Sequence, residues 1–434
     1  MIPSHRNPGS SRRDFLKTSA ALAGAALASA PFVHAAGGDT LKVGLIGCGG
    51  RGSGAASQAL HADKNVQLVA LADAFGDRLQ SCLSNLKNEG DIASKIAVTP
   101  DTSFTGFDAY KKLIPLCDVV LLATPPGFRP MHLEAAIAAG KHVFCEKPMA
   151  VDGPGIRKVL AAAEEAKKKN LSLVSGFCWR YHGAMRDTMK RVHDGEIGDI
   201  VALQCTYNTG PLWMRPRKPE WADMEYQMRN WYYYAWLSGD FNVEQHIHSL
   251  DKMAWALGNQ YPAKAVALGG RQVRTGPEFG HIYDHHAVAY EYPNGARLFS
   301  YCRQQAGTAS DVSDHLFGTK ALGHIDANRG GIGSFQKLGG EVFWRTGPGK
   351  DSMYQNEHDE LFASIRSGKP INDGDWMARS TLMGIMGRMA SYTGQVITWE
   401  QALNSKEDLS PPTYDMKASL PTPPVAMPGM TKFV

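Results

Sequence analysis

The chain has 434 residues, of which 43% are hydrophobic and 20% charged, and its formal net charge is +4. These values are typical of a globular protein of about two domains, and they exclude a largely disordered chain and a membrane-embedded one. The low charge, with no basic run longer than Lys167–Lys169, also excludes an extended nucleic-acid surface, so we expect no nucleic-acid partner.

The N-terminus has the order of an export signal. Residues 11–17 read S-R-R-D-F-L-K, an Ala-rich apolar stretch covers residues 20–32, and V-H-A at 33–35 is a small-residue cleavage site. The apolar stretch is shorter than the roughly 20 residues that span a bilayer. Because the paired arginines resemble the twin-arginine signal, we expect residues 1–35 to be a signal peptide read by the Tat export machinery, and the mature protein to be periplasmic. A lone basic N-terminus is the alternative interpretation.

A glycine-rich turn follows the first apolar strand, which reads L-K-V-G-L-I. The G-x-G-x-x-G spacing falls on Gly47, Gly49 and Gly52, with Gly50 and Arg51 between the last two. Gly47 permits a tight turn, Gly49 lets the backbone approach a pyrophosphate, and Gly52 allows close packing of helix on strand. The pyrophosphate would lie at a helix N-terminus, so the motif predicts a dinucleotide site.

A carboxylate ends the second apolar run. This run covers residues 66–72, and Asp73 follows it at the offset where a carboxylate accepts hydrogen bonds from the adenosine ribose diol. Because Asp73 would repel a 2′-phosphate, we expect NAD as the cofactor. Arg78 lies close in sequence and keeps NADP as the less favoured alternative.

Strand-like and helical segments alternate through the rest of the first half. Strands are predicted at 118–123, 142–146 and 171–176, and helices at 130–139 and 155–168. The alternation predicts a doubly wound parallel sheet over residues 38–176, with ligands bound beyond the carboxyl ends of its strands. The sequences A-T-P-P and C-E-K-P stand at two such ends, although a proline after a strand is also an ordinary terminator.

The second half mixes strands with helices. A helix is predicted at 182–194, further helices late in the chain, and strands at 200–207, 263–268, 286–292 and 298–303, the last two joined by a P-N-G hairpin turn. We assign residues 177–420 to a second domain and 421–434 to a tail. The seven cysteines form no C-x-x-C pair, which predicts buried thiols rather than zinc ligands or a disulfide framework.

The motifs together resemble the glucose–fructose oxidoreductase, inositol dehydrogenase and MocA family (Gfo/Idh/MocA). They are G-x-G-x-x-G, A-T-P-P with a histidine downstream, G-K-H-V-F-C-E-K-P, and G-D-F-N-V-E-Q-H-I-H-S-L-D at residues 239–251. The resemblance covers most of the mature chain. It implies an NAD-dependent oxidoreductase acting on a sugar or polyol hydroxyl. It also implies a Rossmann domain followed by an α+β domain whose large, open, mostly antiparallel sheet makes a homo-oligomer.

The resemblance further implies the site residues. The catalytic group falls on Lys147, Glu244 and His248, with a glutamate where the family pattern has a carboxylate of Asp type. The cofactor-binding residues would be Gly47, Gly49, Gly50, Arg51, Gly52, Asp73, Thr124, Pro125, His132, Glu146, Lys147 and Arg180. The substrate-binding residues would be Lys147, Trp179, Arg180, Tyr181, Trp213, Tyr232 and His248.

A helix predicted at 242–257 places Glu244 and His248 four residues apart on one face. Removal of hydride from a carbinol carbon requires loss of the hydroxyl proton, and histidine is a suitable base. In the implied mechanism His248 moves the proton, Glu244 orients the imidazole, and the Lys147 ammonium stabilises the alkoxide. A helix with solvent-facing polar residues is the alternative. We expect no metal site, because His246 points away from both neighbours on a helix.

The segment from Trp213 to Trp236 is rich in tryptophan and tyrosine, interleaved with Arg215, Arg217 and Arg229. Sugar rings stack well on aromatic faces, which makes this segment a candidate substrate loop. Burial in a core or a subunit interface explains the same composition, and both interpretations stay open.

Two other functions fit these residues. One is a redox-neutral enzyme with tightly bound NAD, either a glycosidase or a sugar-to-sugar oxidoreductase, which suits a protein exported with its cofactor. The other is a non-catalytic NAD-binding sensor. Lys147 favours ordinary hydride transfer over the glycosidase, since the NAD-dependent glycosidases we would compare lack this lysine, and a sensor needs neither Lys147 nor His248.

Overall fold

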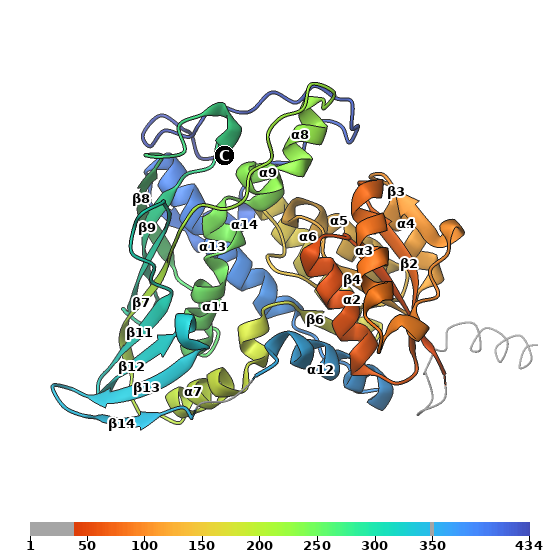
Figure 1. Cartoon of the computed structure of the whole chain (residues 1–434). Helices are drawn as coiled ribbons and strands as arrows, with labels where there is room; N and C mark the ends of the chain where they lie inside the picture. Colours follow the sequence, from red (N-terminus) through yellow and green to blue (C-terminus); the bar gives the residue numbers. More distant parts are fainter. Residues whose placement is uncertain (1–38, 348–350) are drawn as a thin grey trace, which may run out of the picture.

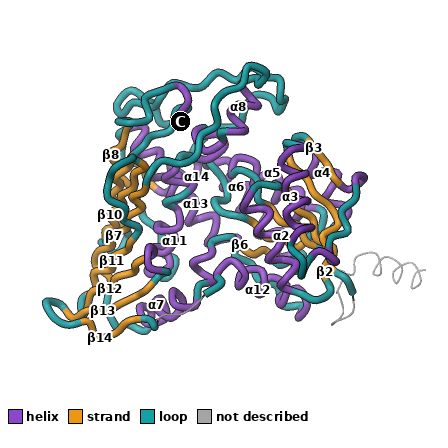
Figure 2. The backbone as a smooth tube through the Cα atoms, viewed as in Figure 1, coloured by secondary structure: helices purple, strands orange, loops and turns teal. Residues whose placement is uncertain are grey.

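The computed structural model describes residues 39–347 and 351–434. The predicted signal peptide, residues 1–35, lies outside these residues. Two β-sheets dominate the molecule, one in each half of the chain, and helices lie between them (Figure 1, Figure 2). Within the described residues, no helix is long and apolar enough to cross a membrane.

The N-terminal sheet has six parallel strands in the order β3-β2-β1-β4-β5-β6. The strands are β1 (Leu41–Ile46), β2 (Val66–Asp73), β3 (Ser103–Thr105), β4 (Val119–Leu122), β5 (His142–Cys145) and β6 (Leu173–Ser175). The helices of this half are α2 (Gly50–Ala62), α3 (Gly76–Asn88), α4 (Ala109–Leu113), α5 (Arg129–Ala138) and α6 (Gly153–Lys168). The predicted Rossmann sheet is confirmed. Strand β3 was not predicted, because a partly exposed three-residue edge strand carries no apolar run.

Helix α12 (Met353–Ser367) returns from the second half of the chain to the N-terminal sheet. Leu361 and Phe362 join the core formed by β1 and α2, and the Arg366 guanidinium pairs with the Asp63 carboxylate at 2.8 Å. The N-terminal half is therefore completed by a segment that the predicted boundary at residue 176 places in the second domain.

The C-terminal sheet has nine strands in the order β14-β13-β12-β11-β7-β10-β9-β8-β15. Neighbouring strands are antiparallel except β7 and β10, which are parallel. The strands are β7 (Ile200–Thr209), β8 (Lys264–Gly270), β9 (His285–Glu291), β10 (Arg297–Gln304), β11 (Ser313–Gly318), β12 (Ala321–Asp326), β13 (Ile332–Lys337), β14 (Val342–Arg345) and β15 (Ile397–Thr398). The predicted large, mostly antiparallel sheet is confirmed.

Helices cover one face of this sheet, so its strands alternate between buried and exposed residues. The main covering helices are α11 (Ile247–Ala256) and α13 (Gly374–Thr393), which lie between the two sheets in Figure 1. The other helices of this half are α7 (Gly183–His193), α8 (Asp223–Arg229), α9 (Ala235–Ser238), α10 (Phe241–Glu244) and α14 (Trp399–Asn404).

The predicted hairpin joins β9 to β10. The Tyr292 amide donates to the Ala296 carbonyl at 2.9 Å, and Gly295 has a φ of 86°. Strands β11 to β14 were not predicted, because sequences such as S-D-H-L-F-G offer few apolar residues in a row. All seven cysteines are buried and free, as the sequence predicts.

Candidate active site

A pocket of about 580 Å³ lies between the two halves of the chain. Its N-terminal wall includes the glycine turn, Asp73 and the residues that follow β4 and β5. Its C-terminal wall comes mainly from the chain between β7 and α11. The lining residues from this second wall are Tyr207, Trp213, Arg215, Met228, Arg229, Trp231, Glu244, Gln245, His248 and Tyr354.

The glycine turn fits a dinucleotide pyrophosphate. Gly47 has a φ of 101°, and a Cβ there would lie 2.6 Å from the backbone of Ala123. A Cβ on Gly52 would lie 1.8 Å from the Gly47 carbonyl oxygen, so helix α2 can pack this closely on β1 only with glycine. Gly49 and Gly50 have open space where a Cβ would stand. A phosphate can therefore approach the backbone at the start of α2.

Asp73 is the last residue of β2 and lines the pocket. Its carboxylate accepts hydrogen bonds from the amides of Cys48 at 2.6 Å and Phe75 at 2.8 Å. Burial raises the pKa of Asp73, while these two amides and the nearby Arg78 act in the opposite direction. The two amides fix the carboxylate at the mouth of the glycine turn, where it fits a ribose diol.

The loops after β4 and β5 are joined by Arg129, a buried residue that the sequence analysis did not single out. Its guanidinium donates to the carbonyl oxygens of Leu122 at 2.8 Å, Thr124 at 2.8 Å and Pro148 at 3.0 Å. These bonds hold the A-T-P-P and E-K-P loops together, and with them the backbone that follows Lys147.

The other residues predicted on these loops also line the pocket, namely Thr124, Pro125, His132 and Glu146. His132 lies under Thr124, with Nδ1 3.3 Å from its hydroxyl, and burial lowers the pKa of His132 to about 3. Glu146 pairs with Arg51 of the glycine turn at 2.6 Å. Both remain on the cofactor side of the pocket.

Lys147 and Glu244 meet across the two halves of the chain. The Lys147 ammonium donates to the Glu244 carbonyl oxygen at 2.6 Å and to its carboxylate at 3.0 Å. Each side chain is 14% exposed. We predicted that the Glu244 carboxylate orients His248, but in this structure the carboxylate contacts Lys147. This contact holds the Lys147 ammonium at the pocket.

His248 lines the same pocket as Lys147 and Glu244. Its Nδ1 is buried and has no hydrogen-bond partner in the described part of the chain. Burial, with the nearby charges of Lys147 and Lys252, lowers the pKa of His248 well below its ordinary value. The imidazole is therefore neutral at physiological pH, and a neutral imidazole has a lone pair that can accept a proton.

The predicted helix 242–257 is wrong, because the structure divides it into α10 and α11 with a turn at Gln245-His246. In a continuous helix the Glu244 carbonyl would accept from the His248 amide. Here the Lys147 ammonium takes that carbonyl, and the His248 amide lies 3.4 Å from the Gln245 carbonyl instead. The contact from the other half of the chain therefore coincides with the interruption of the helix.

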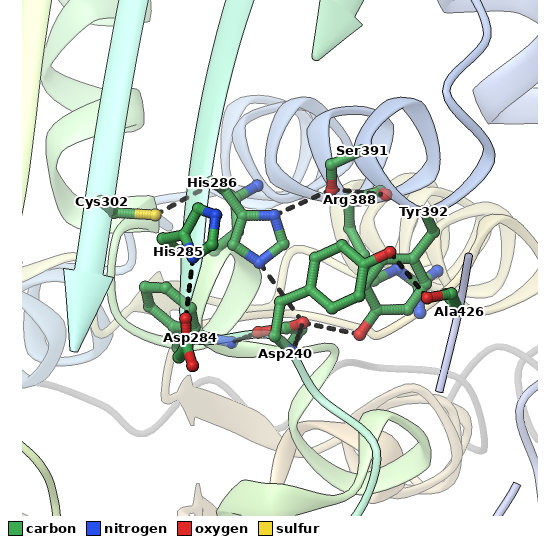
Figure 3. A network of polar contacts seen from close by, with 12 residues as sticks. Asp240, Asp284, His285, His286, Cys302, Arg388, Ser391, Tyr392 and Ala426 are labelled. Atoms are coloured by element: carbon green, nitrogen blue, oxygen red, sulfur yellow. Dashed lines mark hydrogen bonds and ion pairs between the residues drawn. The ribbon is translucent and has the colours of Figure 1, made fainter. Parts of the chain in front are cut away.

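A buried network fixes the start of α10 (Figure 3). Gly239 and Asp240 both have left-handed backbone, with φ values of 77° and 73°, which is unusual for aspartate. The Asp240 carboxylate accepts from the Tyr392 hydroxyl at 2.6 Å and the Tyr283 amide at 3.0 Å, and it lies 3.3 Å from His286 Nε2. Burial opposes ionisation, but His286 and these donors outweigh it and lower the pKa of Asp240. The network holds the turn that precedes Glu244.

Three further histidines, His246, His285 and His286, are the groups that a metal site would need together with Glu244 and His248, and the three have separate partners. His246 Nε2 lies 2.6 Å from the Ser300 hydroxyl, and His285 Nδ1 lies 2.8 Å from the Asp284 carboxylate. His286 Nε2 lies beside the Asp240 carboxylate.

His246 gives a measurable pH dependence of stability. Burial lowers its pKa to about 3, whereas histidine in an unfolded chain titrates near 6.5. The unfolded chain therefore binds an additional proton between these values, and stability contributed at neutral pH is lost as the pH falls below 6.5. Relative to His246→Gln, we expect the wild type to lose about 2 kcal/mol of unfolding free energy from pH 7 to pH 5. Urea unfolding at both pH values measures this, and a difference independent of pH would contradict it.

Four residues predicted to bind ligand are absent from the lining of the main pocket, and three of them, Arg180, Tyr181 and Tyr232, bond to other protein groups. Arg180 is buried, pairs with Asp251 at 2.8 Å and stacks on Trp376, with 4.1 Å from guanidinium carbon to ring centre. Tyr181 donates to Asp373 at 2.6 Å. Tyr232 is buried and donates to Gln245 at 3.3 Å, so it supports a lining residue. None of these three side chains lines the main pocket, and their roles in ligand binding stay predictions.

The two predicted tryptophans lie beside open space. Trp213 lines the main pocket. Trp179 lines a second cavity of about 130 Å³, and this cavity shares Tyr207 and His248 with the main pocket. Two pocket residues, Tyr207 and Tyr354, belong to no motif and were not predicted from the sequence. Arg215, Arg229 and Trp231 also line the pocket, and they belong to the aromatic segment that was a candidate substrate loop.

Known proteins share this fold and these motifs. Residues 41–174 match the model of the oxidoreductase family with an NAD-binding Rossmann fold, GFO_IDH_MocA, and residues 185–322 match the GFO/IDH/MocA C-terminal domain. An inositol 2-dehydrogenase of Serratia proteamaculans is 27% identical over 263 residues, 60% of this chain and 66% of that protein. An inositol 2-dehydrogenase of Rhizobium meliloti is 25% identical over 346 residues, 77% of this chain and 93% of that protein.

Solved structures agree on the architecture. A levoglucosan dehydrogenase in complex with NADH and L-sorbose has a TM-score of 0.66 at 18% identity, covering 83% of this chain and 99% of that one. The aldose–aldose oxidoreductase of Caulobacter crescentus has a TM-score of 0.63 at 21% identity, with coverage of 83% and 99%. The two family models thus cover both halves of the chain, and the solved structures have the same two-sheet fold. The chain belongs to the Gfo/Idh/MocA family of NAD-binding oxidoreductases.

Proposed function

We propose that the protein is an NAD(H)-dependent oxidoreductase that transfers hydride between the nicotinamide and a secondary CH–OH carbon of a sugar or polyol. The observation that carries this proposal is the convergence of Lys147, Glu244 and His248 on the pocket that contains the glycine turn. The names of the inositol and levoglucosan dehydrogenases, which are relatives in sequence or fold, support the substrate class.

Each protein group has one role in this reaction. A bound nicotinamide supplies the acceptor for the hydride that leaves the carbinol carbon. The neutral His248 imidazole accepts the hydroxyl proton, so that the C–O bond becomes a carbonyl. The Lys147 ammonium, held by Glu244, stabilises the negative charge that develops on the oxygen. In the reverse direction His248 returns the proton.

The backbone of Gly49 and Gly50 at the start of α2 would hold the pyrophosphate, and Asp73 would hold the adenosine ribose. The carboxylate of Asp73 repels a 2′-phosphate, which supports NAD over NADP. An exported enzyme would benefit from binding its cofactor tightly. A redox-neutral enzyme that keeps its NAD bound, either a sugar-to-sugar oxidoreductase or a glycosidase, is therefore the second candidate. The fold shared with an aldose–aldose oxidoreductase favours the first of these two.

Release and turnover assays distinguish these functions. The purified full-length protein is denatured and assayed for released NAD(H), and the native protein is then given myo-inositol, levoglucosan, monosaccharides and aryl glycosides, each with and without added NAD. Growth of reduced-nicotinamide absorbance with a free sugar or polyol supports the proposal. Hydrolysis of an aryl glycoside without added cofactor overturns it, and NAD(H) binding without turnover of any probe favours the sensor.

We also propose export by the twin-arginine pathway to the periplasm, with the Tat machinery as partner. The arginine pair at residues 12 and 13 supports this, and so does a fold with seven buried free thiols that needs no oxidising compartment. Replacing both arginines with lysine should leave the protein in the cytoplasm on fractionation. Unchanged export would overturn this part.

The exposed face of the C-terminal sheet supports a homo-oligomer. Val266 and Phe299 lie in one row across β8, β9 and β10, and Leu268 and Tyr301 lie in the next. All four side chains are exposed, Leu268 to 78%, and adjoining apolar residues of this kind mark an interface. We expect Leu268→Glu to shift the assembly toward monomer in sedimentation experiments. Lys111→Glu, on the N-terminal half, should leave the mass unchanged, and an unaltered mass for Leu268→Glu would exclude this face.

A further inference from the structure

Helix α8 belongs to the C-terminal half but contacts the N-terminal half beside Asp73. The Arg229 guanidinium lies over the Phe75 ring, 4.1 Å from the ring centre, and it pairs with the Asp77 carboxylate at 3.1 Å. Phe75 and Asp77 follow Asp73 directly in the chain. Phe75 and Arg229 both line the pocket, so their contact closes its edge at the position of the adenosine ribose.

The loop before α8 is tied to the residue that follows this helix. The Asn230 side chain is buried, accepts from the Arg215 amide at 2.9 Å and donates to the Arg215 carbonyl at 3.1 Å. This pair holds Trp213 and Arg215 in the wall of the pocket. The 210–222 loop, which has no helix or strand after Gly210, is thus held in one position by its own neighbours.

The chain after α14, residues 405–434, forms a longer tail than the predicted 421–434, and it holds α8 from the outside. The Gln227 amide donates to the Leu420 carbonyl at 2.6 Å, and the Asp223 carboxylate accepts from the Ser419 hydroxyl at 3.0 Å. In Figure 1 the tail runs beside α8 at the top of the molecule. The same tail reaches the N-terminal half, where the Tyr414 ring packs on Phe107 and Phe128.

We propose that residues 210–231 form a clasp that retains the dinucleotide, with Arg229 and Phe75 as its closure. The proposal rests on the proposed binding of NAD(H) in this pocket. Because the clasp joins the two halves over the adenosine end, the Arg229–Phe75 contact must open before the cofactor leaves. Arg229 and Phe75 are then cofactor-retaining residues, and they slow exchange without taking part in the chemistry.

Dissociation of NADH from the full-length protein tests the clasp. The protein loaded with NADH is mixed with excess NAD, and the loss of bound-NADH fluorescence gives the dissociation rate. We expect Arg229→Ala to raise this rate about tenfold, since it removes both the ring contact and the ion pair. Asp77→Asn should raise it only about two- to threefold, because Asp77 is largely exposed and the ion pair is screened.

A matched control lies in the same segment. Arg217 pairs with Asp223 at 2.6 Å and is absent from the pocket lining, so Arg217→Ala should change the rate less than about twofold. Arg229→Lys keeps the charge and should release NADH at an intermediate rate. A dissociation rate for Arg229→Ala equal to that of the wild type, with the same thermal midpoint, overturns the clasp alone. Failure of the wild type to bind NADH overturns the proposed function and the clasp with it.

Discussion

Replacing Lys147 with methionine should lower kcat about 100- to 1,000-fold, because removal of one donor to a developing oxyanion has an effect of this size. Methionine keeps the unbranched stem of lysine and deletes the ammonium that donates to Glu244. The glycine turn and Asp73 are untouched, so the dissociation constant for NADH should change little. Steady-state kinetics on the substrate found in the screen, with NADH titration by fluorescence, measures both quantities.

Lys141→Met is the matched control for this variant. Lys141 directly precedes β5, whereas Lys147 follows it, and Lys141 is absent from the pocket lining. We expect Lys141→Met to keep the wild-type kcat. Full activity in a folded Lys147→Met protein would remove the ammonium from the mechanism.

Replacing His248 with asparagine should lower kcat about 100- to 10,000-fold, the range associated with loss of a general base. Asparagine occupies similar space but cannot take the hydroxyl proton. His246→Gln is the control, because His246 is two residues away and faces Ser300 in the sheet. That variant should lose stability and keep its turnover.

The pH profile gives an independent test of His248. Burial and the neighbouring lysines lower its pKa, so the imidazole stays neutral as the pH falls through 6.5, the ordinary value for histidine. In the free enzyme, kcat/KM for substrate oxidation should therefore show no histidine-like decline near pH 6.5 on the acid side. A decline centred at that pH, lost in His248→Asn, would show that the imidazole is not held neutral.

The sequence predicted the N-terminal wall of the pocket because the signals for this wall are local. The glycine turn, Asp73 and Lys147 each lie at or just beyond the carboxyl end of a short apolar strand, and parallel strands bring such ends together at one edge of the sheet. The predicted strands and the position of each residue relative to its strand were enough to place these residues at the pocket.

The opposite wall depends on contacts that one sequence does not reveal. The helix is interrupted after Glu244, where Lys147, 97 residues away, donates to the carbonyl oxygen. Arg180 is removed from the pocket by Asp251, 71 residues away. The local sequence pattern predicts a helix or an available charged side chain without regard to distant residues. Contacts with distant residues decide where the helix ends and whether the charge is free.

The parallel pair β7 and β10 has a consequence for how this enzyme can vary. The two strands are neighbours in the sheet, and the chain that links them supplies the pocket residues from Trp213 to His248. Insertions or exchanges in the part of that chain before β8 can reshape specificity while the strand pairing and its outer face stay as they are. Substrate preference and assembly can therefore diverge separately in descendants of this sequence.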